Sequence, residues 1–157
     1  MDDLTGELDY PMVIVTAASN GERSGCLVGF HTQCSIEPMR WAVWISKANH
    51  THGVAGDASA LVVHFPSVDD QDLAELFGEA TGDEVDKFEQ CAWTEGPGGL
   101  PLLDRIGNRI LGPVVDRIDD GGDHECFVIA VDDVQHASRL RQLAFQHVRD
   151  LDPGHPA

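Results

Sequence analysis

Apolar residues in the first half of the chain come in short runs that are typical of β-strands. The runs 10–18 (YPMVIVTAA), 40–47 and 59–65 are rich in Val, Ile and aromatic residues, which favour strands over helices. Asn20-Gly21 lies between the first run and the stretch 24–38, and an Asn-Gly pair at such a place predicts a hairpin. We therefore expect 10–18 to pair with a single strand in 24–38 that ends at Pro38, followed by strands at 40–47 and 59–65.

Helical spacing is clearest after Pro66. In the stretch 67–80 the apolar positions recur at i, i+3, i+4 and i+7, and acidic residues crowd the first turn. This pattern predicts an amphipathic helix that packs through Leu73, Leu76, Phe77 and Ala80. We also expect one or two helical turns that begin near Asn49 and a second short helix in 81–93.

The second half of the chain predicts two more strands. The runs 109–118 and 124–134 flank the turn sequence DDGGD, and 94–104 is expected to be a loop because it holds three glycines and two prolines. The tail from 138 to 157 fits a helix or a strand (LAFQHV) equally well. About six strands with helices between them indicate a mostly β, α+β fold, a closed antiparallel barrel with short helical insertions. The length suits one domain over 1–157.

The charge of the chain limits its partners. With 27 acidic residues against 10 Lys and Arg, the formal net charge is −17, so we expect no binding to nucleic acid or to anionic membranes. No apolar run is long enough to span a bilayer, and the acidic start lacks a signal-peptide pattern. These features predict a cytoplasmic protein, in which Cys26, Cys34, Cys91 and Cys126 are reduced thiols.

The stretch 24–38 is unusual for a core strand. If it is one strand, Cys26, Val28, Phe30, Thr32 and Cys34 share one face, and neither face is uniformly apolar. Cys26 and Cys34 would then lie about 26 Å apart, too far to form a disulfide. Gly29 marks either a bulge at a barrel corner or a place where another backbone or a ligand approaches closely. On the second interpretation the strand lines a pocket, where its backbone N–H groups and the Thr32 and Gln33 side chains meet a flat polar ligand.

Two further stretches offer polar chemistry. Ser46, Lys47, Asn49 and Thr51 directly follow a strand, where a helix start supplies free N–H groups and Lys47 a cation; this favours phosphate binding, with an ordinary helix cap beside a solvated lysine as the alternative. His124 follows the DDGGD turn, where an imidazole is either a hydrogen-bond donor to an anionic ligand and a proton carrier or simply a solvated turn residue.

A metal site is not expected. His50 and His52 form an H-x-H pair and His64 lies further on, but no third ligand stands at a recognisable spacing. In a helical or loop segment, residues i and i+2 also point in different directions.

The order of these stretches along the chain resembles that of a known family. SGCLVGFHTQCSIEP (24–38) is followed by SKANHT (46–51), then DKF (86–88) and GDH (122–124). This succession resembles the flavin reductase-like family over roughly 8–137, and GFHTQCSIEP and GDEVDKF are similar to an actinobacterial branch of it. The resemblance implies the fold of that family, a six-stranded antiparallel split β-barrel that binds FMN.

The resemblance also implies roles for residues. The strand from Cys26 to Cys34 would border the isoalloxazine ring, the segment from Ser46 to Thr51 would hold the ribityl phosphate, and His124 would act beside the flavin and the nicotinamide. The residues expected to bind the cofactor are Cys26, Leu27, Val28, Gly29, Thr32, Gln33, Cys34, Ser46, Lys47, Asn49 and Thr51. The implied cofactor is FMN, with FAD as an alternative, and NAD(P)H is the implied co-substrate. Members are usually homodimers with each flavin near the subunit interface.

The leading hypothesis is therefore a flavin reductase that transfers hydride from NAD(P)H to flavin and supplies a partner monooxygenase. The first alternative is a non-enzymatic flavin or haem binder that acts as an electron carrier or sensor. The second is a cofactor-free barrel that serves as an interaction module.

Overall fold

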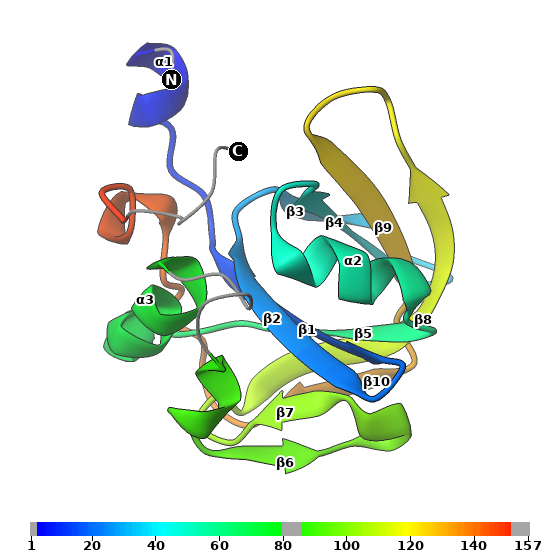
Figure 1. The fold of residues 1–157 in the computed structure, drawn as a ribbon. Helices are drawn as coiled ribbons and strands as arrows, with labels where there is room; N and C mark the ends of the chain where they lie inside the picture. Colours follow the sequence, from blue (N-terminus) through cyan, green and yellow to red (C-terminus); the bar gives the residue numbers. More distant parts are fainter. Residues whose placement is uncertain (1–2, 80–85, 152–157) are drawn as a thin grey trace.

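The protein is mostly β, with its strands gathered in one large antiparallel sheet. The computed structural model describes residues 3–79 and 86–151, and Figure 1 shows two helices packed against the strands. The strands of the main sheet are β1 (Val13–Ser19), β2 (Glu22–Val28), β3 (His31–Ser35), β4 (Arg40–Ser46), β5 (Ala60–His64), β8 (Asn108–Ile118), β9 (His124–Ala130) and β10 (Asp133–His136). The α-helices are α1 (Asp3–Glu7), α2 (His50–Asp57) and α3 (Gln71–Glu79).

The main sheet has the strand order β2-β1-β5-β8-β9-β4-β3, and β10 pairs with β8. Every pairing is antiparallel. The long strand β8 joins the two halves of the sheet, because its first half pairs with β5 and β10 and its second half, after an irregularity between Val114 and Asp116, pairs with β9. A bulge of this kind bends a strand and lets it serve two differently oriented parts of a sheet.

The hairpin between β1 and β2 is confirmed. Asn20 and Gly21 form its two-residue turn, with φ angles of 52° and 77°. Positive φ at both positions is what a type I′ turn requires, and Asn followed by Gly tolerates it best. The register then runs from Ser19 opposite Glu22 to Val13 opposite Val28.

The prediction of one strand across 24–38 is wrong. The chain leaves β2 at Val28, passes through Gly29 and Phe30, and enters β3 at His31. β2 pairs with β1 at one end of the sheet order, whereas β3 pairs with β4 at the other end. The shared face therefore does not exist: Cys26 and Val28 are buried in the core, but Phe30, Thr32 and Cys34 are exposed.

The main core lies on both sides of β1. Val13, Val15 and Ala17 face the side that α2 covers, where Val54 and Ala55 complete the cluster. Ile14 faces the other side, toward α3. A strand buried on both faces reads as a continuous apolar run rather than an alternating one, which is how residues 11–18 appear in the sequence.

Helix α3 confirms most of the helix predicted at 67–80. A 3₁₀ turn, η1 (Val68–Asp70), precedes it, and Ser67 and Asp70 form a capping box in which the Ser67 N–H donates to Asp70 Oδ2 over 2.8 Å. Leu73 and Phe77 are buried as expected, while Ala80 lies outside the described residues. The start of α2 at Asn49 is likewise confirmed.

Two predictions for 81–104 are wrong within the described part. Instead of a helix that reaches 93, residues 86–93 contain one 3₁₀ turn, η2 (Lys87–Glu89), and residues 81–85 lie outside the described ranges. The expected loop 94–104 carries a two-stranded hairpin, β6 (Trp93–Glu95) and β7 (Pro101–Leu103), around the 3₁₀ turn η3 (Pro97–Gly99). This hairpin packs below the main sheet (Figure 1). Its register is set by glycine-rich turn geometry rather than by an apolar pattern.

The C-terminal half differs from expectation in two places. The strand predicted at 124–134 is divided into β9 and β10, so that with the divided 24–38 stretch the six predicted strands become eight in the main sheet. The described part of the tail, 138–151, forms neither helix nor strand: it has one 3₁₀ turn, η4 (Phe145–His147), and isolated bridges to Pro11 and Ser67. Leu143 and Val148 are nevertheless buried, because this segment packs against α3 and Met12.

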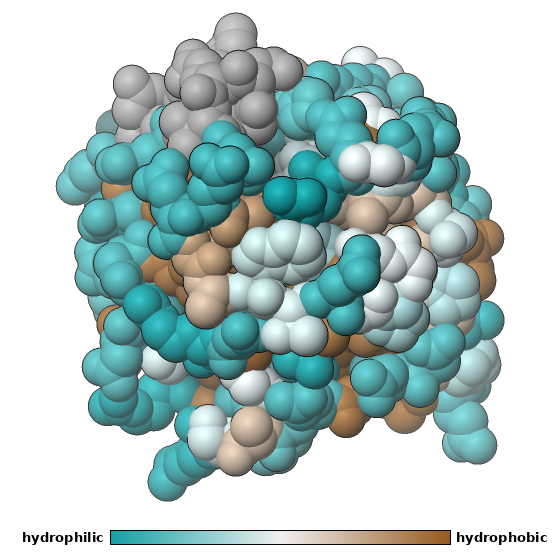
Figure 2. All heavy atoms as spheres, turned by 60° about the horizontal axis from the view of Figure 1, so that its bottom comes forward, coloured by the Kyte–Doolittle hydropathy of each residue, from teal (hydrophilic) through white to brown (hydrophobic). Residues whose placement is uncertain are grey.

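The surface agrees with the acidic composition. Figure 2 shows the side that carries β6 and β7, which is mostly hydrophilic with small separate apolar areas. No helix in the ranges 3–79 and 86–151 is both long and apolar enough to cross a membrane.

Candidate cofactor-binding cleft

A cleft with a volume of about 370 Å³ opens where β2 gives way to β3. Its walls come from the end of β2, the ends of β4 and β9, helix α3 and the C-terminal segment. Seven of the residues expected to bind a cofactor or act in catalysis line it: Cys26, Leu27, Val28, Gly29, Ser46, Asn49 and His124. The structure therefore brings together three stretches that are up to 98 positions apart in the sequence.

Aromatic side chains form much of the wall. The rings of Phe30 and His124 lie 5.0 Å apart, and those of Tyr10 and Phe145 are stacked at 4.8 Å. Trp44 also lines the cleft. A largely apolar cleft with flat aromatic walls and a few polar groups is the usual form of a site for a planar organic ligand.

Most of these wall residues were missed in the sequence. The additional lining residues are Tyr10, Met12, Phe30, Trp44, Phe77, Gly78, Phe145, Val148, Arg149 and Leu151. No local motif marks them, because they come from five separate segments. The aromatic residues that flank the stretch 24–38 were the one available signal.

Gly29 makes room for a side chain of the protein itself. A Cβ atom at Gly29 would lie 2.7 Å from Cε2 of Tyr10 and 3.3 Å from Sδ of Met12. Real Cβ atoms do not approach other heavy atoms so closely, so a larger residue would displace the Tyr10 ring. A close approach at Gly29 is present, but the Tyr10 side chain makes it on this side, rather than the backbone or ligand that was expected.

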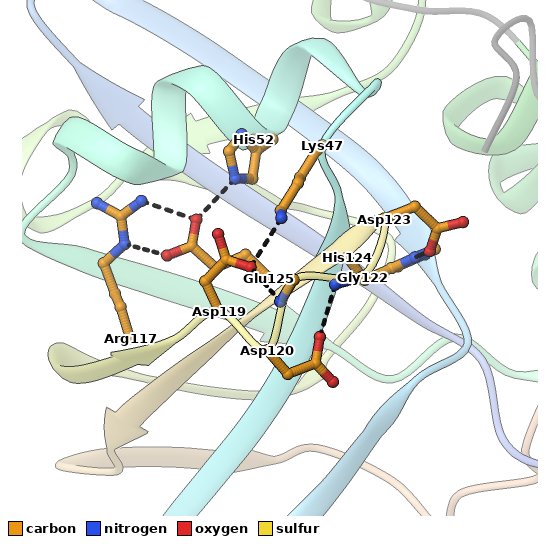
Figure 3. A network of polar contacts seen from close by, with 10 residues as sticks. Lys47, His52, Arg117, Asp119, Asp120, Gly122, Asp123, His124 and Glu125 are labelled. Carbon is orange, nitrogen blue, oxygen red and sulfur yellow. Dashed lines mark hydrogen bonds and ion pairs between the residues drawn. The ribbon is translucent and has the colours of Figure 1, made fainter.

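His124 opens β9 at the edge of the cleft. It lies opposite Ser46 in the pairing of β9 with β4, and its Nδ1 is 2.7 Å from Oδ1 of Asp123 (Figure 3). The hydrogen bond from His124 lowers the pKa of the Asp123 carboxyl group. An anchored imidazole at a cleft rim can donate a hydrogen bond or carry a proton.

The start of α2 forms the polar edge of the cleft. Asn49 caps the helix, with its Oδ1 accepting a hydrogen bond from the Thr51 N–H over 2.9 Å. Ser46 Oγ accepts a bond from the Ala48 N–H over 3.2 Å. Both side chains line the cleft and hold the β4–α2 connection in place.

Lys47 and Thr51 do not line the cleft. The ammonium group of Lys47 is 2.7 Å from Oδ1 of Asp119, on the partly exposed hairpin turn between β8 and β9 (Figure 3). Thr51 is 1% exposed, and its hydroxyl shares a hydrogen bond of 2.7 Å with the Ser24 hydroxyl.

Thr32, Gln33 and Cys34 lie on β3 and are exposed, outside the cleft. The Thr32 hydroxyl donates to the Gln33 carbonyl over 3.1 Å, and the Gln33 amide donates to the Ser35 carbonyl over 3.2 Å. Because the chain changes its strand partner at Gly29–Phe30, these residues move away from Cys26 instead of continuing its face.

An ion-pair network fixes α2 against the sheet behind His124. Glu125 is 8% exposed and accepts two hydrogen bonds from Arg117, of 2.9 and 3.0 Å, while Nε2 of His52 lies 2.9 Å from the same carboxylate (Figure 3). Arg117 is the main cause of the lowered pKa of Glu125. His124 and Glu125 are adjacent on β9 and therefore serve opposite faces.

The cysteine of the cleft is a neutral thiol. Burial raises the pKa of Cys26 to about 11, and only the thiolate form is a strong nucleophile. Within residues 3–79 and 86–151, no group of three or more His, Cys, Asp or Glu side chains is arranged to hold a metal ion.

The chain is similar to a known protein family and to a relative of known activity. The flavin reductase like domain family matches residues 5–152. A ferric-chelate reductase (NAD(P)H) of Archaeoglobus fulgidus is 27% identical over 123 residues, which are 78% of this chain and 73% of that protein.

Two solved structures have similar folds. An FMN-binding protein from Thermus thermophilus with bound 1-cyclohex-2-enone is 25% identical, with a TM-score of 0.76 over 83% of this chain and 72% of that one. A flavin reductase domain protein from Arthrobacter sp. FB24 is 19% identical, with a TM-score of 0.82 over 99% of this chain and 92% of that one. At 19% identity, the similarity to the Arthrobacter protein shows a shared fold alone.

Proposed function

Because the chain belongs to the flavin reductase-like family, as the match over residues 5–152 shows, we propose that it is an FMN-binding oxidoreductase that transfers hydride from NAD(P)H to flavin. The single observation that carries the proposal is the aromatic cleft of about 370 Å³ at the β2–β3 crossing, with His124 at its rim. The similar proteins from Archaeoglobus fulgidus and Thermus thermophilus, named for NAD(P)H and FMN, support it.

The residues of the cleft fit a flavin ring. Backbone groups along Cys26–Gly29 offer donors and acceptors for its carbonyl and ring nitrogen atoms, and the aromatic walls match its flat faces. Hydride chemistry, the uptake of two electrons and a proton from NAD(P)H, would be supplied by a flavin held by these residues. The chain binds and orients the two nucleotides, the aromatic walls exclude water, and His124 holds or delivers a proton at Nε2, since Nδ1 is engaged with Asp123.

Five residues to which the resemblance assigned cofactor contacts do not line the cleft, so this proposal gives them no direct contact with the ring: Thr32, Gln33, Cys34, Lys47 and Thr51. Thr32, Gln33 and Cys34 face outward on β3 and are available to a ligand only through a neighbouring subunit. Thr51 acts indirectly, by holding the Ser24 hydroxyl. We propose that the residues that contact the ring are the seven predicted ones that line the cleft.

We further propose that the sheet is the split barrel of the family. β2 continues directly into β3 although the two strands stand at opposite ends of the sheet order, so two consecutive strands close the path that the other strands form. The cleft lies at this closure, where the two halves of the sheet meet.

An apolar row on the sheet favours a homodimer. Phe30, which directly precedes β3, lies beside Trp44 of β4, and the row continues through the buried Cys126 of β9 to Ile118 of β8, on the face away from α2. Phe30 is 52% and Ile118 51% exposed. Exposed apolar rows of this kind favour association, and Phe30 and Trp44 also line the cleft, so a second subunit here would border the cofactor.

The setting of the activity follows from the same premise. The four cysteines are free thiols, which suits the reducing cytoplasm. A soluble partner, such as a monooxygenase that consumes reduced flavin, is the proposed recipient of the electrons.

The test is to record the visible spectrum of the purified protein, add FMN, and then measure NADH and NADPH oxidation. We expect flavin binding and a rate of NAD(P)H oxidation well above that of free flavin. A protein that binds flavin without turnover is an electron carrier or sensor, and a protein that binds neither flavin nor haem contradicts the proposal.

A further inference from the structure

One wall of the cleft is built from both ends of the chain. We call its six residues the terminal wall; two come from the segment before β1 and four from the C-terminal segment: Tyr10, Met12, Phe145, Val148, Arg149 and Leu151. The two segments are joined by backbone bonds, because the Met12 N–H donates to the Leu143 carbonyl and the Phe145 N–H to the Tyr10 carbonyl, each over 2.8 Å. The terminal wall therefore holds together as one unit.

The Pro11 carbonyl lies on the other side of this unit. Successive carbonyl groups of an extended chain point to opposite sides, so the Tyr10 carbonyl faces the C-terminal segment and the Pro11 carbonyl faces away from it. Proline has no backbone N–H, so this carbonyl is the only group through which Pro11 forms hydrogen bonds. Its partner is His31, whose Nε2 lies 2.7 Å from the Pro11 oxygen. His31 thus joins the terminal wall to β3.

His31 directly follows the crossing from β2 to β3. The two residues of the crossing, Gly29 and Phe30, line the cleft, whereas His31 does not. Across the cleft, the rings of Phe30 and Tyr10 lie 6.5 Å apart. One imidazole outside the cleft therefore connects the crossing to the segment that carries Tyr10.

The hydrogen bonds of His31 fix its protonation state. The Trp41 side chain, which can only donate, bonds Nδ1 of His31 through its Nε1 over 3.2 Å. Nδ1 therefore carries no proton, and the single proton of the neutral ring lies on Nε2, which donates it to the Pro11 carbonyl. Burial lowers the pKa of His31 against the opposing effect of this bond, so the ring keeps this neutral form at pH 7.

Aromatic side chains restrict the orientation of the His31 ring. Trp41 lies against it at a ring-centre distance of 6.0 Å and an angle of 23°. Phe65, which follows β5, meets both rings edge-on, at 6.4 Å from His31 and 5.5 Å from Trp41. These contacts and the Trp41 bond hold Nε2 toward Pro11. A side chain that its surroundings hold in this way can fix the position of the group that it bonds.

We propose that His31 is a positioning residue of the cleft, which holds the terminal wall at its distance from the β2–β3 crossing through the Pro11 carbonyl. This inference rests on the proposed function only in naming flavin as the ligand that the cleft encloses. Loss of the bond would leave the carbonyl without its partner. The segment 10–12 would then move, together with the C-terminal segment that is bonded to it, and the cleft would enclose its ligand less closely.

Two substitutions of His31 separate the hydrogen bond from the bulk of the ring. His31→Gln keeps a donor for the Pro11 carbonyl, and His31→Leu has a similar size without a donor. Amide hydrogen exchange measured by NMR reports on the wall without any ligand. In His31→Leu the Met12 and Phe145 amides should exchange about tenfold faster, the factor that corresponds to one lost hydrogen bond. In His31→Gln they should stay within about threefold of the wild type, and the amides of β9 should be unchanged in both variants.

Flavin binding supplies the second readout. Quenching of flavin fluorescence should give a dissociation constant for FMN that is about tenfold higher in His31→Leu and within about threefold of the wild type in His31→Gln. Because His31 touches no reacting atom, kcat at saturating flavin should change by less than about threefold in either variant. His136→Leu, on the exposed strand β10, is the matched control and should behave as the wild type.

A third measurement needs no change of His31 and guards against a folding defect. Nitrogen-15 NMR of the wild-type ring should show the His31 proton on Nε2 and none on Nδ1. Trp41→Phe removes the bond that selects this form and should let both neutral forms appear. Circular dichroism establishes that each variant is folded.

The outcomes separate the two proposals. Equal exchange rates in His31→Leu and His31→Gln, acceleration that extends equally through β9, an unchanged FMN dissociation constant in His31→Leu, or a wild-type proton on Nδ1 overturns the positioning role, while flavin binding by the wild type stands. Faster exchange confined to Met12 and Phe145 in a protein that binds no flavin supports the role of His31 and refutes the proposed function. Absence of both effects overturns both proposals.

Discussion

The backbone N–H of Leu103 donates a hydrogen bond of 3.0 Å to Nε2 of His64, a side chain with no exposed surface. Nδ1 of the same ring is 3.1 Å from the Ile14 carbonyl. A ring that accepts at Nε2 and donates at Nδ1 must be neutral. His64 therefore ties β7 to β1 and β5 only in its uncharged form.

This bond predicts that stability falls in mild acid. Burial lowers the pKa of His64 to about 3 from an ordinary value of 6.5, so below pH 6.5 the unfolded chain takes up a proton that the folded chain refuses. Stability is then lost at about 1.4 kcal/mol per pH unit as the pH falls from 6.5 toward 3. Between pH 7.5 and 5 we expect the free energy of unfolding in urea to fall by about 2 kcal/mol from this group.

The control for this prediction is a histidine on the surface. His64→Gln should be less stable at pH 7.5 and should lose most of the pH dependence, whereas His136→Gln, on the exposed strand β10, should keep it. An unchanged slope in His64→Gln would show that other groups cause the acid sensitivity.

The two ion pairs at the β8–β9 hairpin should differ in their effect on stability. Glu125→Ala removes a largely buried carboxylate that bonds both Arg117 and His52, and we expect a loss of about 1–3 kcal/mol in the free energy of unfolding. Asp119→Ala removes the exposed pair with Lys47, and because solvent screens such pairs we expect little change. Chemical denaturation of the two variants checks the contrast, and equal losses would contradict it.

Replacing His124 should affect turnover more than cofactor binding. His124→Asn keeps a hydrogen-bonding side chain at the rim but removes the proton-carrying imidazole, and we expect kcat/KM for NAD(P)H to fall by about 10- to 100-fold. The dissociation constant for FMN should stay within a factor of about three. A variant with wild-type turnover would show that His124 is only a wall residue, and His136→Asn serves as the matched control.

The apolar row across the sheet predicts a change in oligomeric state. Ile118→Asp places a charge in the row and should convert dimer to monomer in light scattering, because a buried unpaired carboxylate is costly at an interface. Val134 is similarly exposed, at 57% against 51%, but lies on β10 away from the row. Val134→Asp should therefore remain dimeric, and a wild-type monomer at high concentration would end the proposal.

The sequence predicted the strands well where the signal was local. The six predicted strand segments overlap every strand of the main sheet, although β3 and β10 were merged with their neighbours, and Asn20-Gly21 located a turn, because both signals depend on neighbours in the chain. The break at Gly29–Phe30 was missed, since nothing in an apolar pattern states which strand a segment will pair with. The tail was missed for a related reason: Leu143 is buried by contact with α3 and Met12 and not by helical periodicity.

The candidate site was predicted in part for the same reason. Cys26–Gly29, Ser46, Asn49 and His124 lie near motifs that the sequence displays, and they meet in the cleft. The cavity lined by Arg23, His50 and Lys87 was not predicted. Arg23 and His50 are 27 positions apart and His50 and Lys87 are 37 apart, and they come together only through the packing of β2, α2 and η2. Lys47 was expected to bind the cofactor. Its ion pair with Asp119, 72 positions away, cannot be read from the residues that adjoin Lys47 in the sequence.

The change of strand partner at Gly29–Phe30 has a consequence for how this segment can vary. Inserting or deleting one residue between Val28 and His31 would shift the register of β3 on β4 relative to that of β2 on β1, and a one-residue shift turns every side chain to the wrong face. We therefore expect the length of this segment to be more strongly constrained than the identity of its residues. Substitutions in this segment can change which ligands the cleft binds, whereas insertions and deletions would disrupt the strand pairing.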